Sequence, residues 1–227
     1  MRHILLFLFS HRFLAIARWD LHMLFVRIGN ALTRQNRQVR RFMATRQEPV
    51  FLNLGSGPRG LDDPHWVNID AFRDKNVHFL MDFSRRLPFA DATFTGVFCE
   101  HVLEHFTLED GDRIAREILR ILKPSGRFRI VVPDAGLVVQ RYVDSPSELV
   151  AWRSEGNETP MEVVNSFFRQ RYEHQFLYDW PTMEKVLLAA GFKEVYRSKC
   201  GENIAGGQIA LDDAKYEWES LYVEAMK

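Results

Sequence analysis

The sequence predicts an α/β fold, with a mostly parallel sheet, helices on both of its faces and a helical N-terminal extension. Short apolar runs alternate with helical patterns from residue 50 onward, which is typical of a parallel sheet. The run at 50–54 ends in a Gly-Ser-Gly turn, and the next run ends on Asp70. The 227 residues, 46% of them hydrophobic, suit one such domain with an appendage.

The individual elements follow from apolar periodicity and from turn residues. The clearest helix is expected at 108–122, where Thr107 provides an N-cap and Pro124 ends the apolar stripe. Further helices are expected to cover parts of 135–142, 160–172 and 181–190. Strands are expected at 50–54, 66–69, 77–81, 94–99, 127–132, 193–199 and 219–225.

The glycine turn and the carboxylate after it resemble half of a nucleoside site. Gly55 and Gly57 have no Cβ, so their backbone can approach a ligand closely. Asp70 can accept hydrogen bonds from ribose hydroxyls. A dinucleotide site needs a third glycine and a carboxylate about 20 residues later, whereas Pro58 follows here and Asp70 comes 13 residues after Gly57. We therefore expect a ribose ligand without phosphate, such as S-adenosylmethionine.

Later segments strengthen this prediction by their order along the chain. They are Asp82 to Phe94, Val97 to His105, Arg116 to Gly126, Ala189 to Phe192 and Glu219 to Ala225. In this order they resemble class I S-adenosylmethionine-dependent methyltransferases, most closely bacterial members with a Glu-His-x-Leu-Glu-His block, which are often associated with polysaccharide or envelope biosynthesis. The resemblance covers residues 50–227 and implies a Rossmann-like, seven-stranded sheet. The chain departs from the family pattern at Asn53, often acidic there, and at Ser125, usually glycine.

The resemblance also implies roles for residues just past the predicted strand ends, where ligands of such sheets bind. The expected cofactor contacts are Gly55, Ser56 and Gly57 at the methionyl end, Asp70 at the ribose, Asp82 and Phe83 at the adenine, and Glu100 below the reactive methyl. Two simpler roles stay open, because Asp70 could cap a strand end and Asp82 could cap a turn at Ser84.

Catalysis on the acceptor side is expected from His101, Glu104 and His174. Methyl transfer is an in-line displacement, in which the protein positions the nucleophile and removes water. A hydroxyl acceptor gains from a general base, because it is a weak nucleophile until it loses its proton. The expected acceptor is an oxygen or nitrogen atom of a small molecule or a glycan-related, envelope-related compound.

The block from His101 to His105 has a second interpretation. It matches the His-x-x-Glu-His motif of some zinc peptidases, in which two histidines on one helix face bind zinc. One alternative is therefore a zinc-dependent hydrolase, and another is a non-catalytic module that binds a cofactor or a partner. These side chains could also simply pack inside the domain. The methyltransferase prediction itself includes no metal ion.

Residues 1–48 are predicted to form a basic amphipathic extension, and 49–227 the domain, with acceptor elements at 134–180 and 200–216. The extension has nine arginines against Asp20 and Glu48, so its formal charge is +7 and that of the remainder is −7. Nucleic acid is not an expected partner of so acidic a domain.

The extension has several possible partners. Its apolar stretch is interrupted by Arg12 and Arg18, and a transmembrane helix needs about 20 apolar residues. It could dock on the domain, contact a second subunit, lie on a membrane surface or act as a targeting peptide. Because the two cysteines cannot form a disulfide framework, we expect a cytoplasmic protein, with contact to the inner face of the membrane as an option.

Overall fold

The computed structural model describes residues 10–153, 156, 158–203, 209 and 211–227. Its centre is a seven-stranded sheet with the strand order β3-β2-β1-β4-β5-β7-β6. Neighbouring strands are parallel, except that β7 runs antiparallel to both β5 and β6. The predicted fold class is confirmed. The strands are Phe51–Leu54 (β1), Trp66–Asp70 (β2), Phe79–Leu80 (β3), Phe94–Glu100 (β4), Leu122–Pro133 (β5), Glu194–Ser198 (β6) and Ser220–Met226 (β7).

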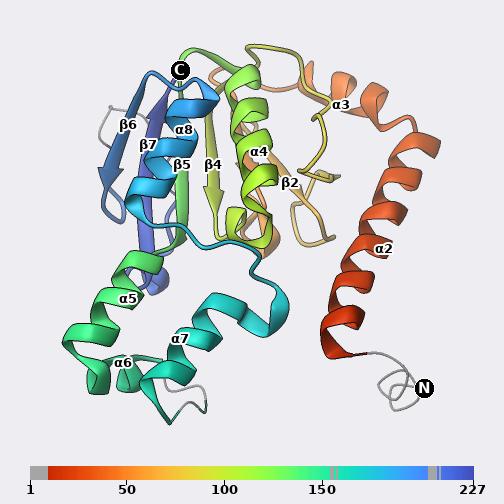
Figure 1. The fold of residues 1–227 in the computed structure, drawn as a ribbon. Helices are drawn as coiled ribbons and strands as arrows, with labels where there is room; N and C mark the ends of the chain where they lie inside the picture. Colours follow the sequence, from red (N-terminus) through yellow and green to blue (C-terminus); the bar gives the residue numbers. More distant parts are fainter. Residues whose placement is uncertain (1–9, 154–155, 157, 204–208, 210) are drawn as a thin grey trace.

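Helices surround this sheet, and Figure 1 shows three of them, α5, α6 and α7, grouped beyond its carboxyl end. The α-helices are His11–Leu32 (α2), Gln35–Met43 (α3), Leu108–Ile121 (α4), Ala135–Asp144 (α5), Pro146–Trp152 (α6), Pro160–Arg169 (α7) and Trp180–Ala190 (α8). Short 3-10 turns cover Gly57–Arg59 (η1), Leu103–His105 (η2), Gln170–Tyr172 (η3) and Ala214–Tyr216 (η4).

The main core lies between the sheet and the neighbouring helices α4 and α8 (Figure 1). The helix α4 buries Ile114, Ile118 and Ile121, as its apolar spacing predicts. Its N-terminus is capped by Thr107, whose hydroxyl accepts from the backbone N–H of Asp110 at 3.2 Å. A smaller cluster on the opposite face includes Trp66.

Two local features differ from the sequence-based expectation. The strand expected at 77–81 pairs only at Phe79–Leu80. The helix expected within 160–172 is present as α7, and it ends at Arg169 because Gln170 and Arg171 take left-handed backbone conformations, with φ of 34° and 55°. Helix α6 was not expected. Ser125, at the family's glycine position, has a φ of 60°, so it adopts the turn that glycine usually supplies.

The extension docks on the domain at the β2–β3 side of the sheet. Met23 and Val26 of α2 form a buried cluster with Ala71. Arg27 Nε donates to Asp82 Oδ2 at 2.7 Å, and Asn30 Nδ2 donates to the Leu80 carbonyl at 3.0 Å. One of the predicted alternatives, docking on the domain, is therefore realised by this face of α2.

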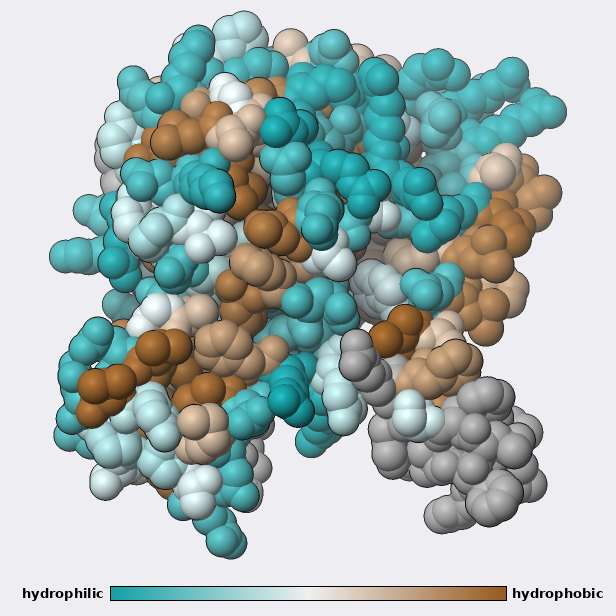
Figure 2. Space-filling view, viewed as in Figure 1, coloured by the Kyte–Doolittle hydropathy of each residue, from teal (hydrophilic) through white to brown (hydrophobic). Residues whose placement is uncertain are grey.

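The opposite face of α2 is apolar and uncovered in this structure. It carries Leu21, Leu24, Phe25, Ile28 and Leu32, with exposed fractions between 46% and 79%. Figure 2 shows hydrophobic side chains along the outer side of this helix. Within the described ranges, no helix combines the length and the apolarity needed to cross a bilayer. Membrane-surface contact, dimerisation and cytoplasmic location stay predictions.

Candidate active site

The predicted cofactor residues come together at one edge of the sheet. Strands β1, β2, β3 and β4 are mutually parallel neighbours, so their carboxyl ends meet at this edge. Gly55 and Asp82 follow β1 and β3 closely, while Asp70 and Glu100 are the last residues of β2 and β4. This is the position at which ligands bind in open α/β sheets.

Gly55 and Gly57 shape the turn after β1. Both have positive φ values, +74° and +48°. A Cβ on Gly55 would stand 2.2 Å from a methyl carbon of Val102, whereas a Cβ on Gly57 would meet no atom within 4 Å. The first glycine thus permits close packing of the loop after β4, and the second borders open space.

Asp70 holds this turn against β2. Its Oδ2 accepts from the Gly57 N–H at 2.8 Å, and its Oδ1 accepts from the Phe72 N–H at 2.8 Å. The N–H groups of Gly55 and Ser56 donate to the Ile69 carbonyl at 2.9 and 3.1 Å. All three N–H groups of the turn are therefore engaged within the protein, and the predicted contact of Gly55, Ser56 and Gly57 with the methionyl end stays a prediction.

Other groups at the turn still fit a polar ligand. Ser56 is 3% exposed, and its Oγ has no hydrogen-bond partner among the residues that the structure describes. Each oxygen of the half-buried Asp70 carboxylate accepts a single N–H and retains a second lone pair. With the open space beside Gly57, these acceptors suit the ribose of S-adenosylmethionine.

Asp82 and Phe83 are buried at the end of β3. Asp82 Oδ1 accepts from the N–H and the hydroxyl of Ser84, at 3.0 and 2.7 Å, and Oδ2 accepts from Arg27. Asp82 thus caps the turn at Ser84, which was one of the two predicted roles. Phe83 packs near Phe106, with ring centroids 6.4 Å apart. Arg27 was not predicted as a partner of Asp82, because nothing local links it to a residue 55 positions away.

Glu100 is almost fully buried and is held by two groups that the sequence did not suggest. It forms an ion pair with Arg59 from η1, and its Oε1 accepts from the Asp213 N–H at 2.9 Å. Arg59 lies in a short 3-10 turn and Asp213 directly precedes another, and apolar periodicity gives no signal in such segments. In this structure the carboxylate is therefore committed to protein groups, and its predicted contact with the cofactor stays a prediction.

The partly buried His101 forms an ion pair with the buried Glu104 after β4. His101 Nδ1 lies 3.3 Å from Glu104 Oε1, and its Nε2 lies 3.0 Å from the Ser220 hydroxyl. Burial tends to lower the pKa of His101, but the hydrogen bond and charge of Glu104 outweigh it and raise this pKa above 6.5. His101 holds the pKa of Glu104 below its usual value despite burial. A larger fraction of His101 is therefore protonated at neutral pH than of an isolated histidine.

His174 lies beside Glu104, although it is 70 positions further along the chain. The N–H groups of Gln175 and Phe176 donate to the Glu104 carbonyl at 2.7 and 3.2 Å, which fastens this segment to η2. The His174 ring lies 5.3 Å from that of His105, and burial lowers its pKa. The structure thus brings together the three predicted catalytic residues and adds His105.

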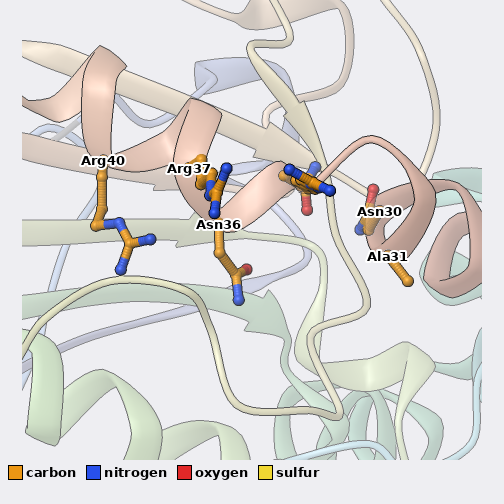
Figure 3. Close-up of a pocket in the computed structure, with 7 residues that line it drawn as sticks. Asn30, Ala31, Asn36, Arg37 and Arg40 are labelled. Atoms are coloured by element: carbon orange, nitrogen blue, oxygen red, sulfur yellow. The ribbon is translucent and has the colours of Figure 1, made fainter.

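Two cavities lie beside the extension. One, of about 530 Å³, is lined by residues of α2, of α3 and of the turn between them, including Asn36, Arg37 and Arg40 (Figure 3). The other, of about 410 Å³, lies between this turn and the loop after β3 and reaches Asp82. Its lining also includes Arg85 and Arg86, so basic side chains adjoin the sheet edge at this cavity.

Comparisons with known proteins agree with this architecture. The family model described as a methyltransferase domain matches residues 64–130. A ubiquinone/menaquinone biosynthesis C-methyltransferase of Idiomarina loihiensis is 28% identical over 159 residues, which are 64% of this chain and 57% of that protein. The uncharacterized methyltransferase YcgJ of Bacillus subtilis is 37% identical over 57 residues, 25% of this chain and 22% of that protein.

A solved structure has the same fold. The 1,6-didemethyltoxoflavin-N1-methyltransferase of Burkholderia thailandensis, with bound S-adenosylhomocysteine, aligns with a TM-score of 0.50 at 17% identity, over 96% of this chain and 90% of its own. The chain spans less than two thirds of the length of the two curated relatives. The predicted resemblance to class I methyltransferases is confirmed. The match to the methyltransferase-domain model spans residues 64–130.

Proposed function

We propose that this protein is an S-adenosylmethionine-dependent methyltransferase. The observation that carries the proposal is the pairing of Asp70 with the glycine turn. One carboxylate fixes that turn and keeps lone pairs for ribose hydroxyls, at the sheet edge where His101 and Glu104 also lie. The matched methyltransferase domain includes Asp70, Glu100 and Glu104.

The chain's own residues would bind and orient the reactants. When bound, S-adenosylmethionine supplies a methyl group on a sulfonium, which is already activated for transfer. Asp70 would hold the ribose, and Phe83 would pack near the adenine. The pair of His101 and the buried Glu104 would position the acceptor and exclude water at the end of β4.

The acceptor is proposed to offer an oxygen or nitrogen atom of a small or glycan-related molecule. Helices α5 to α7 stand beyond the carboxyl edge of the sheet (Figure 1), where an acceptor would enter. His174 lies beside Glu104. The relative from Idiomarina loihiensis is named as a C-methyltransferase. Candidate acceptors for a first screen therefore include quinone precursors together with sugars that carry free hydroxyls or amines.

Calorimetric titration with S-adenosylmethionine and S-adenosylhomocysteine tests this function. We expect micromolar binding, about −8 kcal/mol. We expect Asp70→Ala to weaken binding at least tenfold, or about 1.4 kcal/mol, because the ribose loses its acceptor. A well-folded wild-type protein that binds neither compound would overturn the proposal.

Two further variants separate a lost contact from a lost fold. The exposed Asp62→Ala on the same crossover should bind like the wild type. Asp70→Asn keeps one acceptor oxygen for the turn, so it should fold while still weakening ribose binding. Thermal unfolding of each variant shows whether the turn remains intact.

We also propose that the extension contacts an anionic membrane surface. The uncovered face of α2 is apolar from Leu21 to Leu32, and the exposed Arg34, Arg37 and Arg41 follow it directly. An apolar helix face beside basic side chains suits an interfacial helix on anionic lipid. A second copy would instead bring two extensions of charge +7 together.

Vesicle co-sedimentation tests this contact. The full chain should bind vesicles rich in phosphatidylglycerol and should bind those of phosphatidylcholine alone much less. Leu24→Ser with Phe25→Ser should reduce binding at least tenfold, whereas Leu188→Ser, at an exposed position on α8, should not. Equal binding by all variants would contradict the proposal, and so would a stable dimer that buries this face in sedimentation velocity.

A further inference from the structure

A second possible binding site lies within the acceptor-side cluster of Glu104, His105 and His174. Each of these residues offers a ligand atom of the kind that metals prefer, and those atoms all lie within 4.8 Å of one another. Glu104 and His105 belong to η2, and His174 follows η3. The fold therefore assembles the cluster from segments that are distant in sequence, through the backbone hydrogen bonds to the Glu104 carbonyl.

Both histidines of this cluster have one ring nitrogen fixed by a backbone carbonyl. His105 Nδ1 lies 3.2 Å from the Glu173 carbonyl oxygen, and His174 Nδ1 lies 2.8 Å from that of Phe167. A carbonyl oxygen can only accept a hydrogen bond, so each Nδ1 must carry the proton. In the neutral rings each Nε2 then has a free lone pair. This arrangement is the one that orients histidines bound to metals.

The carboxylate of Glu104 is the third ligand group. Its side chain is 1% exposed. Oε1 lies 4.0 Å from His105 Nε2, while Oε2 has no hydrogen-bond partner in the described part of the chain. A buried carboxylate oxygen without a donor is unfavourable, and two imidazole lone pairs close to it add no donor. A cation at this point would compensate all three groups together.

We propose that Glu104, His105 and His174 bind a divalent metal ion. Two imidazole nitrogens and one carboxylate favour ions such as Zn²⁺, Mn²⁺ or Co²⁺ over Mg²⁺, which prefers an all-oxygen set. Three protein ligands leave coordination positions open, as in catalytic sites. The His105 side chain is 28% exposed, so the cluster is accessible from solvent.

The catalytic use of this ion rests on the proposed methyltransferase function. A hydroxyl of the acceptor would occupy an open position, and the ion would lower the pKa of that hydroxyl so that its proton is lost to water. The oxygen would then form a bond to the methyl carbon, while the carbon–sulfur bond breaks and its electron pair remains on sulfur. His101, paired with Glu104, would be a positioning residue for this site.

Metal uptake by the untagged full chain tests the site without cofactor or acceptor. Protein stripped with a chelator should bind about one Zn²⁺ or Mn²⁺ per chain in a calorimetric titration. We expect His174→Ala and Glu104→Gln to weaken this binding at least tenfold. Co²⁺ should give a visible absorption spectrum that changes in both variants.

His65 provides a matched control, because its Nδ1 also contacts backbone carbonyls, those of Gln47 and Pro49. His65→Ala should bind metal like the wild type. If Glu104→Gln does not fold, His105→Asn keeps the test informative, because His105 lies at the solvent-accessible side of the cluster. Lack of uptake by folded wild-type protein, or equal uptake by the cluster variants, would overturn the proposal.

The two proposals can fail separately. Titration of the metal-stripped protein with S-adenosylhomocysteine measures the cofactor side alone. Metal uptake with no cofactor binding would keep the metal site and remove the methyltransferase function. Cofactor binding with no metal uptake would keep the methyltransferase function and remove the metal site.

Discussion

The two halves of the candidate site are built in different ways. On the cofactor half, the glycine turn and Asp70 lie on adjacent strands joined by one short crossover, and they bond directly to each other. On the acceptor half, Glu104 and His174 belong to distant segments that meet through main-chain hydrogen bonds. A short stretch of sequence can therefore specify the first half, whereas only the complete fold specifies the second.

The largest effect is expected from crowding the glycine turn. Gly55→Ala adds a Cβ that collides with Val102, at a position where φ is positive. The free energy of unfolding, measured in urea, should therefore fall by about 2–4 kcal/mol. The Cβ of Gly57→Ala meets no atom within 4 Å. Its free energy of unfolding should fall by only about 1 kcal/mol, because of backbone strain. Equal losses would show that packing against Val102 contributes nothing to the turn.

A crossed pair of variants tests whether the two halves are independent. Asp70→Ala should weaken S-adenosylhomocysteine binding at least tenfold, about 1.4 kcal/mol, and leave metal uptake unchanged. His174→Ala should do the opposite, because its contacts lie on η2 and α7. Calorimetry of both ligands on both variants measures this, and a variant that loses both would break the distinction.

A smaller effect is expected at the contact between the extension and the cofactor half. Arg27→Met removes the ion pair with Asp82, but the Arg27 side chain is 42% exposed and water screens the interaction. We expect a loss of about 0.5–1 kcal/mol in unfolding free energy, and less in high salt. Arg18→Met, at an exposed position of the same helix, should change nothing measurable.

The smallest effect concerns pH and His78, beside β3. Its Nδ1 accepts from the Asn68 N–H at 2.9 Å, which requires the neutral ring. Burial, and then the charge of Arg46, lower the pKa of His78 below 6.5, although Asp62 opposes this. The unfolded chain therefore binds more protons, so stability is complete above pH 6.5 and falls as the pH drops below it. In urea unfolding at several pH values, the free energy of unfolding of His78→Asn should vary less with pH than that of the wild type.

The difference between the halves also explains what the sequence could predict. Each predicted strand overlaps a strand of the structure, because buried apolar runs and their flanking turns are local signals. The positions of Gly55 and Asp70 followed from these strands. The break at Gln170 and the contact of Gln175 with Glu104 depend on packing between segments, which periodicity does not encode. His105 was visible only as part of a motif, and its partner His174 only as an isolated histidine.

The Arg27–Asp82 contact has a consequence for the whole molecule. If the adenine amino group displaces Arg27 from Asp82 Oδ2, the ligand and the extension compete for one carboxylate oxygen. Thermodynamic linkage then makes the effect reciprocal. If cofactor binding favours release of α2 from the sheet by a given factor, release of α2 strengthens cofactor binding by the same factor. The N-terminal helix would then be a regulator of occupancy as well as a structural support.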